Sequence, residues 1–213
     1  MNFFLRSIVL ASLIVGPIFA GAGAGTGART SKTPFPQAAP PASTEDKTAP
    51  SYDMKAQAVL DLQQMQQKFT SLAQAIPQEK YTWRPGEGAR TFAELFLHVS
   101  GAGFGFPGMK GTPPAPGFVA KGFEKSTTDK AQVIEWLNKS FAYSIESVQS
   151  MSNAEFAKLL PKLGPQANAG DVVYLMVEHQ HEQLGVAIAY ARAVGVVPPW
   201  TADALSKKNT QNP

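Results

Sequence analysis

Apolar residues recur at steps of three and four along four long stretches of this 213-residue chain. The stretches span residues 52–75, 92–102, 128–151 and 171–195, and glycines and prolines lie between them. Such spacing puts the apolar side chains on one face of an α-helix, and no stretch shows the period-two alternation of a half-buried strand. The sequence therefore predicts an all-α fold, a four-helix bundle with a short extra helix.

Polar residues indicate where several of these helices begin. Thr91 with Glu94, and Ser152 with Glu155, have the spacing of a capping box, in which the hydroxyl and the carboxylate bond the backbone amides reciprocally. Asn168 is expected to cap the fourth long helix, and Thr127 or Thr128 the third.

Glycine and proline indicate where regular structure stops. We expect an irregular, lid-like loop over residues 101–117, and a two-turn helix after Ser152 that ends at Pro161. Gly195 is a natural C-terminal cap, and the tail after Trp200 is expected to be polar and frayed. The first helix is expected to bury a stripe of Met54, Ala58, Leu62, Met65, Phe69 and Leu72, and the third a stripe of Val133, Trp136, Leu137, Phe141, Ile145 and Val148.

The N-terminal segment resembles an export signal. Residues 1–20 contain one cation, Arg6, and then an apolar run of about a dozen residues that is followed by small residues, so cleavage is expected after Ala20 or as late as Ala24. The run is shorter than the ~20 residues that span a bilayer, so no stable membrane anchor should remain. Residues 21–50 read as a flexible linker, 51–200 as the bundle and 201–213 as the polar tail; the protein is expected to be periplasmic or extracellular.

Composition excludes several functions. The chain has no cysteine, which rules out disulfides, thiolate nucleophiles, cysteine zinc sites and iron–sulfur ligation. Its net charge of +3 is not gathered into a run of Lys or Arg, so no nucleic-acid partner is expected.

The chain's three histidines lie on two of the predicted helices. His98 falls on or beside the apolar face of residues 92–102. His179 shares one helix face with Glu182 and Gln183, three and four residues further on. His181 is about 200° around the helix from His179 and should point away.

Two histidines that converge inside a bundle are typical of a metal site, because imidazole suits Zn, Ni, Cu or Fe. A single histidine on an apolar face is more often a hydrogen-bonded core residue, and two imidazoles need a third donor. Glu182 is chemically the better third donor, whereas Gln183 is in the better position. Alternatively, Glu182 and Glu178 are solvated charges on the surface. Glu94 is a further candidate, as a ligand or as the partner that orients His98.

Residues 91–104, TFAELFLHVSGAGF, and 178–200, EHQHEQLGVAIAYARAVGVVPPW, together with the connection YTWRPGEGAR before the first of them, resemble the DinB/YfiT-like superfamily. The resemblance covers residues 51–200. It implies a four-helix bundle, often dimeric, with a divalent metal held by one histidine of the second helix and two of the fourth. His98 and His179 match the first two ligands, and Gln183 stands where the third histidine is expected.

The resemblance leaves two hypotheses for the function. In the first, the protein is an exported enzyme of the thiol S-transferase or hydrolase type. It would use Zn, Ni, Mn or Fe at His98, His179 and either Gln183 or Glu182 to activate a small-molecule or thiol substrate. In the second, it is a metal-free bundle that serves in binding or homodimerisation.

Overall fold

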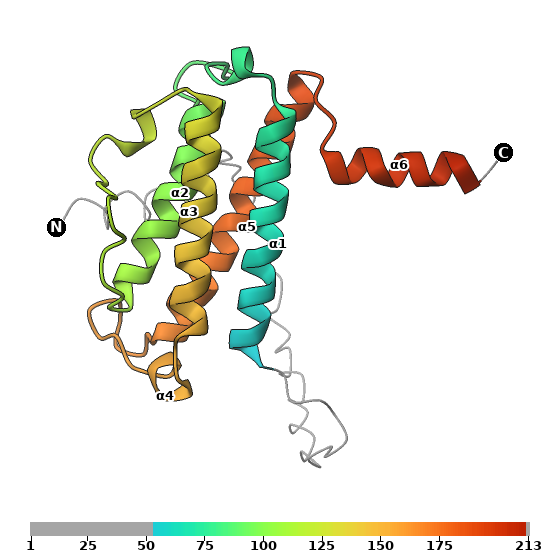
Figure 1. The fold of residues 1–213 in the computed structure, drawn as a ribbon. Helices are drawn as coiled ribbons and strands as arrows, with labels where there is room; N and C mark the ends of the chain where they lie inside the picture. The colour runs from blue at the N-terminus through green and yellow to red at the C-terminus, as the bar shows by residue number, and fades with distance from the viewer. Residues whose placement is uncertain (1–52, 212–213) are drawn as a thin grey trace, which may run out of the picture. The chain divides into compact units, whose positions relative to one another are not determined.

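The computed structural model describes residues 53–211, and four long helices run alongside one another within them (Figure 1). These helices are α1 (Met54–Ala75), α2 (Phe92–Met109), α3 (Lys130–Gln149) and α5 (Ala169–Ala193). The shorter elements are η1 (Gln78–Lys80), η2 (Phe123–Lys125), α4 (Asn153–Phe156) and α6 (Pro199–Gln211). The described residues contain no strand, only an isolated bridge between Leu159 and Asn168. The predicted four-helix bundle is confirmed.

Helices α1 and α2 each pack against both α3 and α5. Helix α1 runs antiparallel to α2, whereas α2 and α3 run in the same direction and α5 returns against them (Figure 1). The parallel pair needs a long crossover, residues 110–129, which includes η2. Tyr143 on α3 donates a hydrogen bond to the Pro113 carbonyl of this crossover. The crossover is therefore fastened to the bundle at that point.

Three of the predicted helix starts are confirmed. Thr91 with Glu94 caps α2, Ser152 with Glu155 caps α4, and Asn168 with Asp171 caps α5, each as a complete capping box. The expected cap of α3 was wrong by one or two residues. Asp129 accepts from the Gln132 amide, while Thr127 accepts from Asp129 itself. Gly195 follows α5 with φ of +79°, a backbone conformation that glycine adopts without strain.

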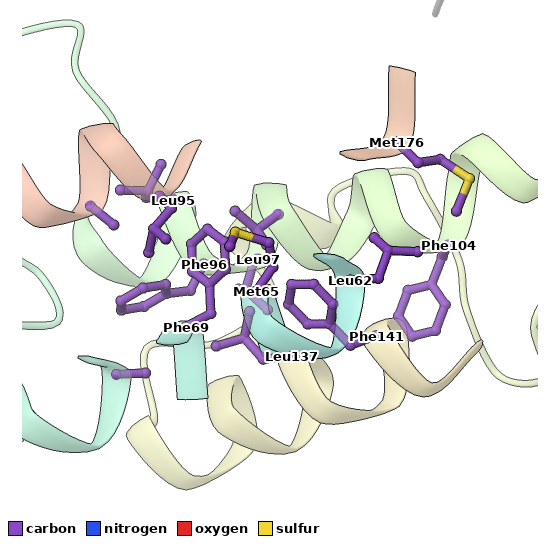
Figure 2. Packing of buried hydrophobic residues seen from close by; sticks show 14 of the residues in the cluster. Leu62, Met65, Phe69, Leu95, Phe96, Leu97, Phe104, Leu137, Phe141 and Met176 are labelled. Atoms are coloured by element: carbon purple, nitrogen blue, oxygen red, sulfur yellow. The ribbon is translucent and has the colours of Figure 1, made fainter. Parts of the chain in front are cut away.

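Aromatic and branched side chains from the long helices fill the core (Figure 2). Phe69 of α1 lies between Phe96 of α2 and Phe141 of α3, with ring centroids 6.4 and 5.8 Å away. All three rings are almost completely buried, which contributes roughly 1.5–3 kcal/mol for each side chain. The stripes predicted for α1 and α3 are buried except at Met54, which is 55% exposed, and Trp136, which is half-buried. Met54 is the first residue of α1, where the helix has only just entered the core.

Helix α2 is longer than expected, because residues 101–109 are helical instead of forming a lid-like loop. Gly103 allows close packing of α2 on α3: a Cβ there would lie 3.2 Å from Cβ of Ser140 and from Oγ of Ser144. Pro107 lacks the N–H that would bond the Gly103 carbonyl one turn earlier. Ser144 Oγ donates to that carbonyl at 2.8 Å instead. A side chain on α3 thus supplies the hydrogen bond that α2 lacks at its proline.

Two other boundaries also differ from the prediction. Helix α4 has only one turn, because the next residues pair with another segment: the Leu160 amide donates to Ala167 and the Ala169 amide to Lys158. The C-terminal tail was expected to be frayed, but α6 begins at Pro199 and runs to Gln211. Proline suits the first position of a helix because its missing N–H would have no partner there.

The predicted signal peptide (residues 1–20, cleaved as late as Ala24) lies outside the described residues, as does the predicted linker over 21–50. Export and homodimerisation stay predictions. Among the described residues, no helix is long and apolar enough to cross a membrane.

Candidate functional site

The site begins with two histidines on facing helices. His98 lies on α2 and His179 on α5, and their Nε2 atoms are 3.2 Å apart. The chain brings them together because both helices bury an apolar face against each other, and the edge of Phe106 packs on the ring of His179 at a centroid distance of 5.3 Å. The predicted convergence of these histidines is thus observed. His181 is exposed, as its angular position predicted.

Glu124 is a third member of the site that the sequence did not indicate. Its Oε1 atom lies 2.8 Å from His98 Nδ1, and its Oε2 atom accepts from Arg90 Nε at 2.8 Å. Glu124 lies on η2 at the end of the crossover, 26 residues after His98. Its neighbour Phe123 is buried against Phe118 and Trp136, at centroid distances of 5.0 and 5.2 Å. This aromatic contact holds η2 where the carboxylate reaches the imidazole.

The role suggested for Glu94 was therefore wrong. Glu94 was a candidate ligand or partner of His98, but its Oε2 accepts from the Thr91 amide at 2.8 Å and lies 3.8 Å from Arg84 Nη2. The capping box holds this carboxylate at the helix start, and Glu124 orients His98 instead. No spacing rule relates a loop carboxylate to a helix histidine, so only the folded chain reveals the pair.

Electrostatics keep one imidazole neutral. Burial, together with the smaller effects of the charges of His98 and Arg90, lowers the pKa of His179 to about 4. Burial alone would raise the pKa of Glu124, but its hydrogen bonds to His98 and Arg90 prevail and hold it at about 2. At neutral pH the site therefore presents an ionised carboxylate behind His98 and an uncharged ring at His179.

The hydrogen bonds determine where the lone pairs lie. When the His98 ring is neutral and its Nδ1–H donates to Glu124, the Nε2 atom of His98 carries a lone pair that faces His179. A direct hydrogen bond then requires His179 to donate from Nε2. His179 Nδ1 is buried and has no partner among the described residues, so this tautomer leaves its lone pair unpaired.

The pair also fits a metal ion. Two nitrogens bound to one tetrahedral ion at about 2.1 Å lie roughly 3.4 Å from each other, close to the 3.2 Å observed. A carboxylate on the far nitrogen of a ligating histidine is the usual arrangement around such ions. Within the described residues, no group of three or more His, Asp or Glu side chains could hold a metal.

Gln183 and Glu182 occupy different surroundings. Gln183 is half-buried and lines an open cleft of about 620 Å³ that also reaches Glu124 and Arg90. Glu182 and Glu178 are exposed and do not line the cleft. Gln183 therefore lies at the wall of the cleft and Glu182 does not, and the ligand roles of both residues stay predictions.

These features define a class: an all-α bundle with a histidine pair between two facing helices, a carboxylate behind one histidine, and a cleft beside the pair. The family model of the DinB superfamily matches residues 61–187, a range that includes His98, His179 and Gln183. The chain belongs to the DinB superfamily, as its sequence motifs predicted.

One solved structure supports the same fold. The crystal structure of a DinB-like protein from Bacillus subtilis is similar with a TM-score of 0.53 and 17% sequence identity, and the match covers 66% of this chain and 93% of that one. At that identity the likeness concerns the fold alone. No match was found among curated proteins.

Proposed function

We propose that this DinB-superfamily protein binds a divalent metal ion through His98 and His179, and acts as a metal-dependent enzyme of the thiol S-transferase or hydrolase type. The observation that carries the proposal is the pair of Nε2 atoms 3.2 Å apart with Glu124 on the far side of His98. A bound divalent ion would lower the pKa of a coordinated thiol or water, and so supply a nucleophile at neutral pH.

The chain's own residues divide the remaining tasks. His98 and His179 supply the two imidazole donors, and Gln183 offers an amide oxygen at the cleft wall. Glu124 orients His98 by accepting from Nδ1, and Arg90 holds Glu124. Burial against Phe106 keeps His179 uncharged, so its lone pair stays available at neutral pH. Glu124 and Gln183 line the cleft, so a substrate bound in it would lie next to the residues that serve the metal.

Metal titration tests this proposal, with purified protein that carries no histidine tag. We expect about one equivalent of Zn, Ni, Mn or Fe per chain by calorimetry and elemental analysis. His98→Ala and His179→Ala should each abolish it. His181→Ala is the matched control, because it removes an exposed histidine of the same helix and should change nothing. Metal well below one equivalent in the unaltered protein would refute the proposal.

Activity separates the two reaction types. With metal bound, consumption of a low-molecular-weight thiol in the presence of an alkylating electrophile indicates S-transfer, and release of nitrophenol from an ester indicates hydrolysis. Either rate should fall to background in His98→Ala and persist in His181→Ala. If the protein binds one equivalent of metal but shows neither activity, it is a metal-binding protein, and the proposal that it is an enzyme is refuted.

A further inference from the structure

The cleft beside the histidine pair is lined by more cationic than anionic side chains. Three cationic side chains, Arg84, Arg90 and Lys125, face two carboxylates, Glu94 and Glu124, which leaves one positive charge in excess. Both carboxylates already have partners: Glu94 accepts from the Thr91 amide, and Glu124 is bound by His98 and Arg90.

The cations are less fully paired than the carboxylates. Arg84 lies 3.8 Å from Glu94, beyond hydrogen-bond distance, and its side chain is 46% exposed. Lys125 is exposed, and its side chain makes no ion pair with any described residue. Arg84 and Lys125 therefore have unused donors that face the cleft, where an anion of one charge would balance the lining.

Part of the remaining wall is apolar. Leu95 is buried, and Val186 and Tyr190 are half-buried in the same cleft. Trp83 and Phe92 each pack edge-on against the ring of Tyr190 at centroid distances of 5.8 Å, which fixes that ring in place. A ligand that fits this cleft therefore combines one negative charge with an apolar body.

We propose that the cleft binds a small organic acid through one carboxylate, which lies between Arg84 and Lys125 while its apolar body rests on Leu95, Val186 and Tyr190. This inference deepens the proposed function, because it names the substrate class of the same site. The cleft is lined by Glu124, which contacts His98 from the other side, so an acid bound there lies near the histidine pair without touching it. One excess charge favours a carboxylate over a phosphate, which carries about two negative charges at neutral pH.

The test uses three probes with a common body, namely 3-phenylpropionate, its neutral amide, and 3-phenylpropyl phosphate, titrated calorimetrically into metal-free protein. The carboxylate should bind at least about tenfold more tightly than the amide, because a hydrogen bond to a charged group is lost. Equal binding of acid and amide, no binding of the acid at millimolar concentration, or tighter binding of the phosphate would each overturn the proposal.

Charge-removing variants locate the site. Arg84→Gln and Lys125→Gln should each weaken binding of 3-phenylpropionate by about threefold or more. Lys121→Gln is the matched control, since this exposed lysine lies on the same crossover but does not line the cleft. An equal loss in Lys121→Gln and Lys125→Gln would refute the assignment to the cleft.

The two proposals fail independently. His98→Ala should abolish metal binding and leave the affinity for 3-phenylpropionate within about twofold, because His98 does not line the cleft. Lys125→Gln should bind a full equivalent of metal. Loss of acid binding in His98→Ala would refute the separate carboxylate subsite, whereas absence of metal with intact acid binding would refute only the metal proposal.

Discussion

The hydrogen bond from Ser144 to the Gly103 carbonyl should contribute measurably to stability, because it replaces the donor that Pro107 lacks. Ser144→Ala leaves this carbonyl at the α2·α3 interface without the hydroxyl donor. An unsatisfied buried group of this kind costs about 1–3 kcal/mol. For a bundle of this size, that free energy lowers the melting temperature by roughly 2–4 °C per kcal/mol.

Ser140→Ala is the matched control. Ser140 is also 1% exposed on α3, but its hydroxyl bonds the Leu137 carbonyl of its own helix, which keeps its backbone donor when the hydroxyl is removed. Ser140→Ala should lower the free energy of unfolding by only about 0.5–1 kcal/mol, which is the lower part of the range for an ordinary hydrogen bond.

A double-mutant cycle isolates the cause. Pro107→Ala restores the amide that bonds Gly103, so Ser144→Ala should cost at least about 1 kcal/mol less in that background. Urea unfolding followed by helical circular dichroism measures all four proteins. Equal costs for Ser144→Ala and Ser140→Ala, or an unchanged cost in the Pro107→Ala background, would show that the Ser144 hydroxyl does not replace the missing proline donor.

Three further predictions concern the site. Glu124→Gln should weaken metal binding by about 10–100-fold, measured by competition with a chromophoric chelator; unchanged affinity would mean that Glu124 does not act through His98. Gln183→His should tighten binding by at least about tenfold by adding a third imidazole, and no gain would show that the two helices do not present these side chains together. Metal-free protein should lose stability as pH falls from about 6.5 towards 4, because His179 has a folded pKa of about 4 and the unfolded chain binds its proton first. His179→Gln should reduce the pH dependence of the free energy of unfolding, measured with urea, between these two pH values. The same dependence in His179→Gln and in the unaltered protein would contradict the lowered pKa.

Sequence patterns that span only a few residues predicted much of the bundle. The capping boxes at Thr91 and Ser152 were recognisable because the cap and its partner lie three residues apart in sequence, and Asn168 was recognisable as a cap by its residue type. The histidine pair was predictable for a similar reason, since helical periodicity alone places His98 and His179 towards the bundle interior.

What the sequence could not show depends on contacts between distant segments. Glycine and proline after residue 100 suggested a loop, but Ser144, 41 residues away, allows α2 to continue. Glu124 reaches His98 only because Phe123 packs against Phe104 of α2 and Trp136 of α3. Neither contact has a local signal, so the length of α2 and the partner of His98 emerge only from the fold.

The most direct test of the metal proposal is X-ray absorption at the zinc edge on protein loaded with one equivalent of Zn. We expect two imidazole nitrogens at about 2.0–2.1 Å, with oxygen as the remaining ligands. One of these nitrogens should disappear in His98→Ala and neither in His181→Ala. A spectrum without imidazole scattering, or one unchanged by His98→Ala, would show that His98 and His179 do not hold the metal together.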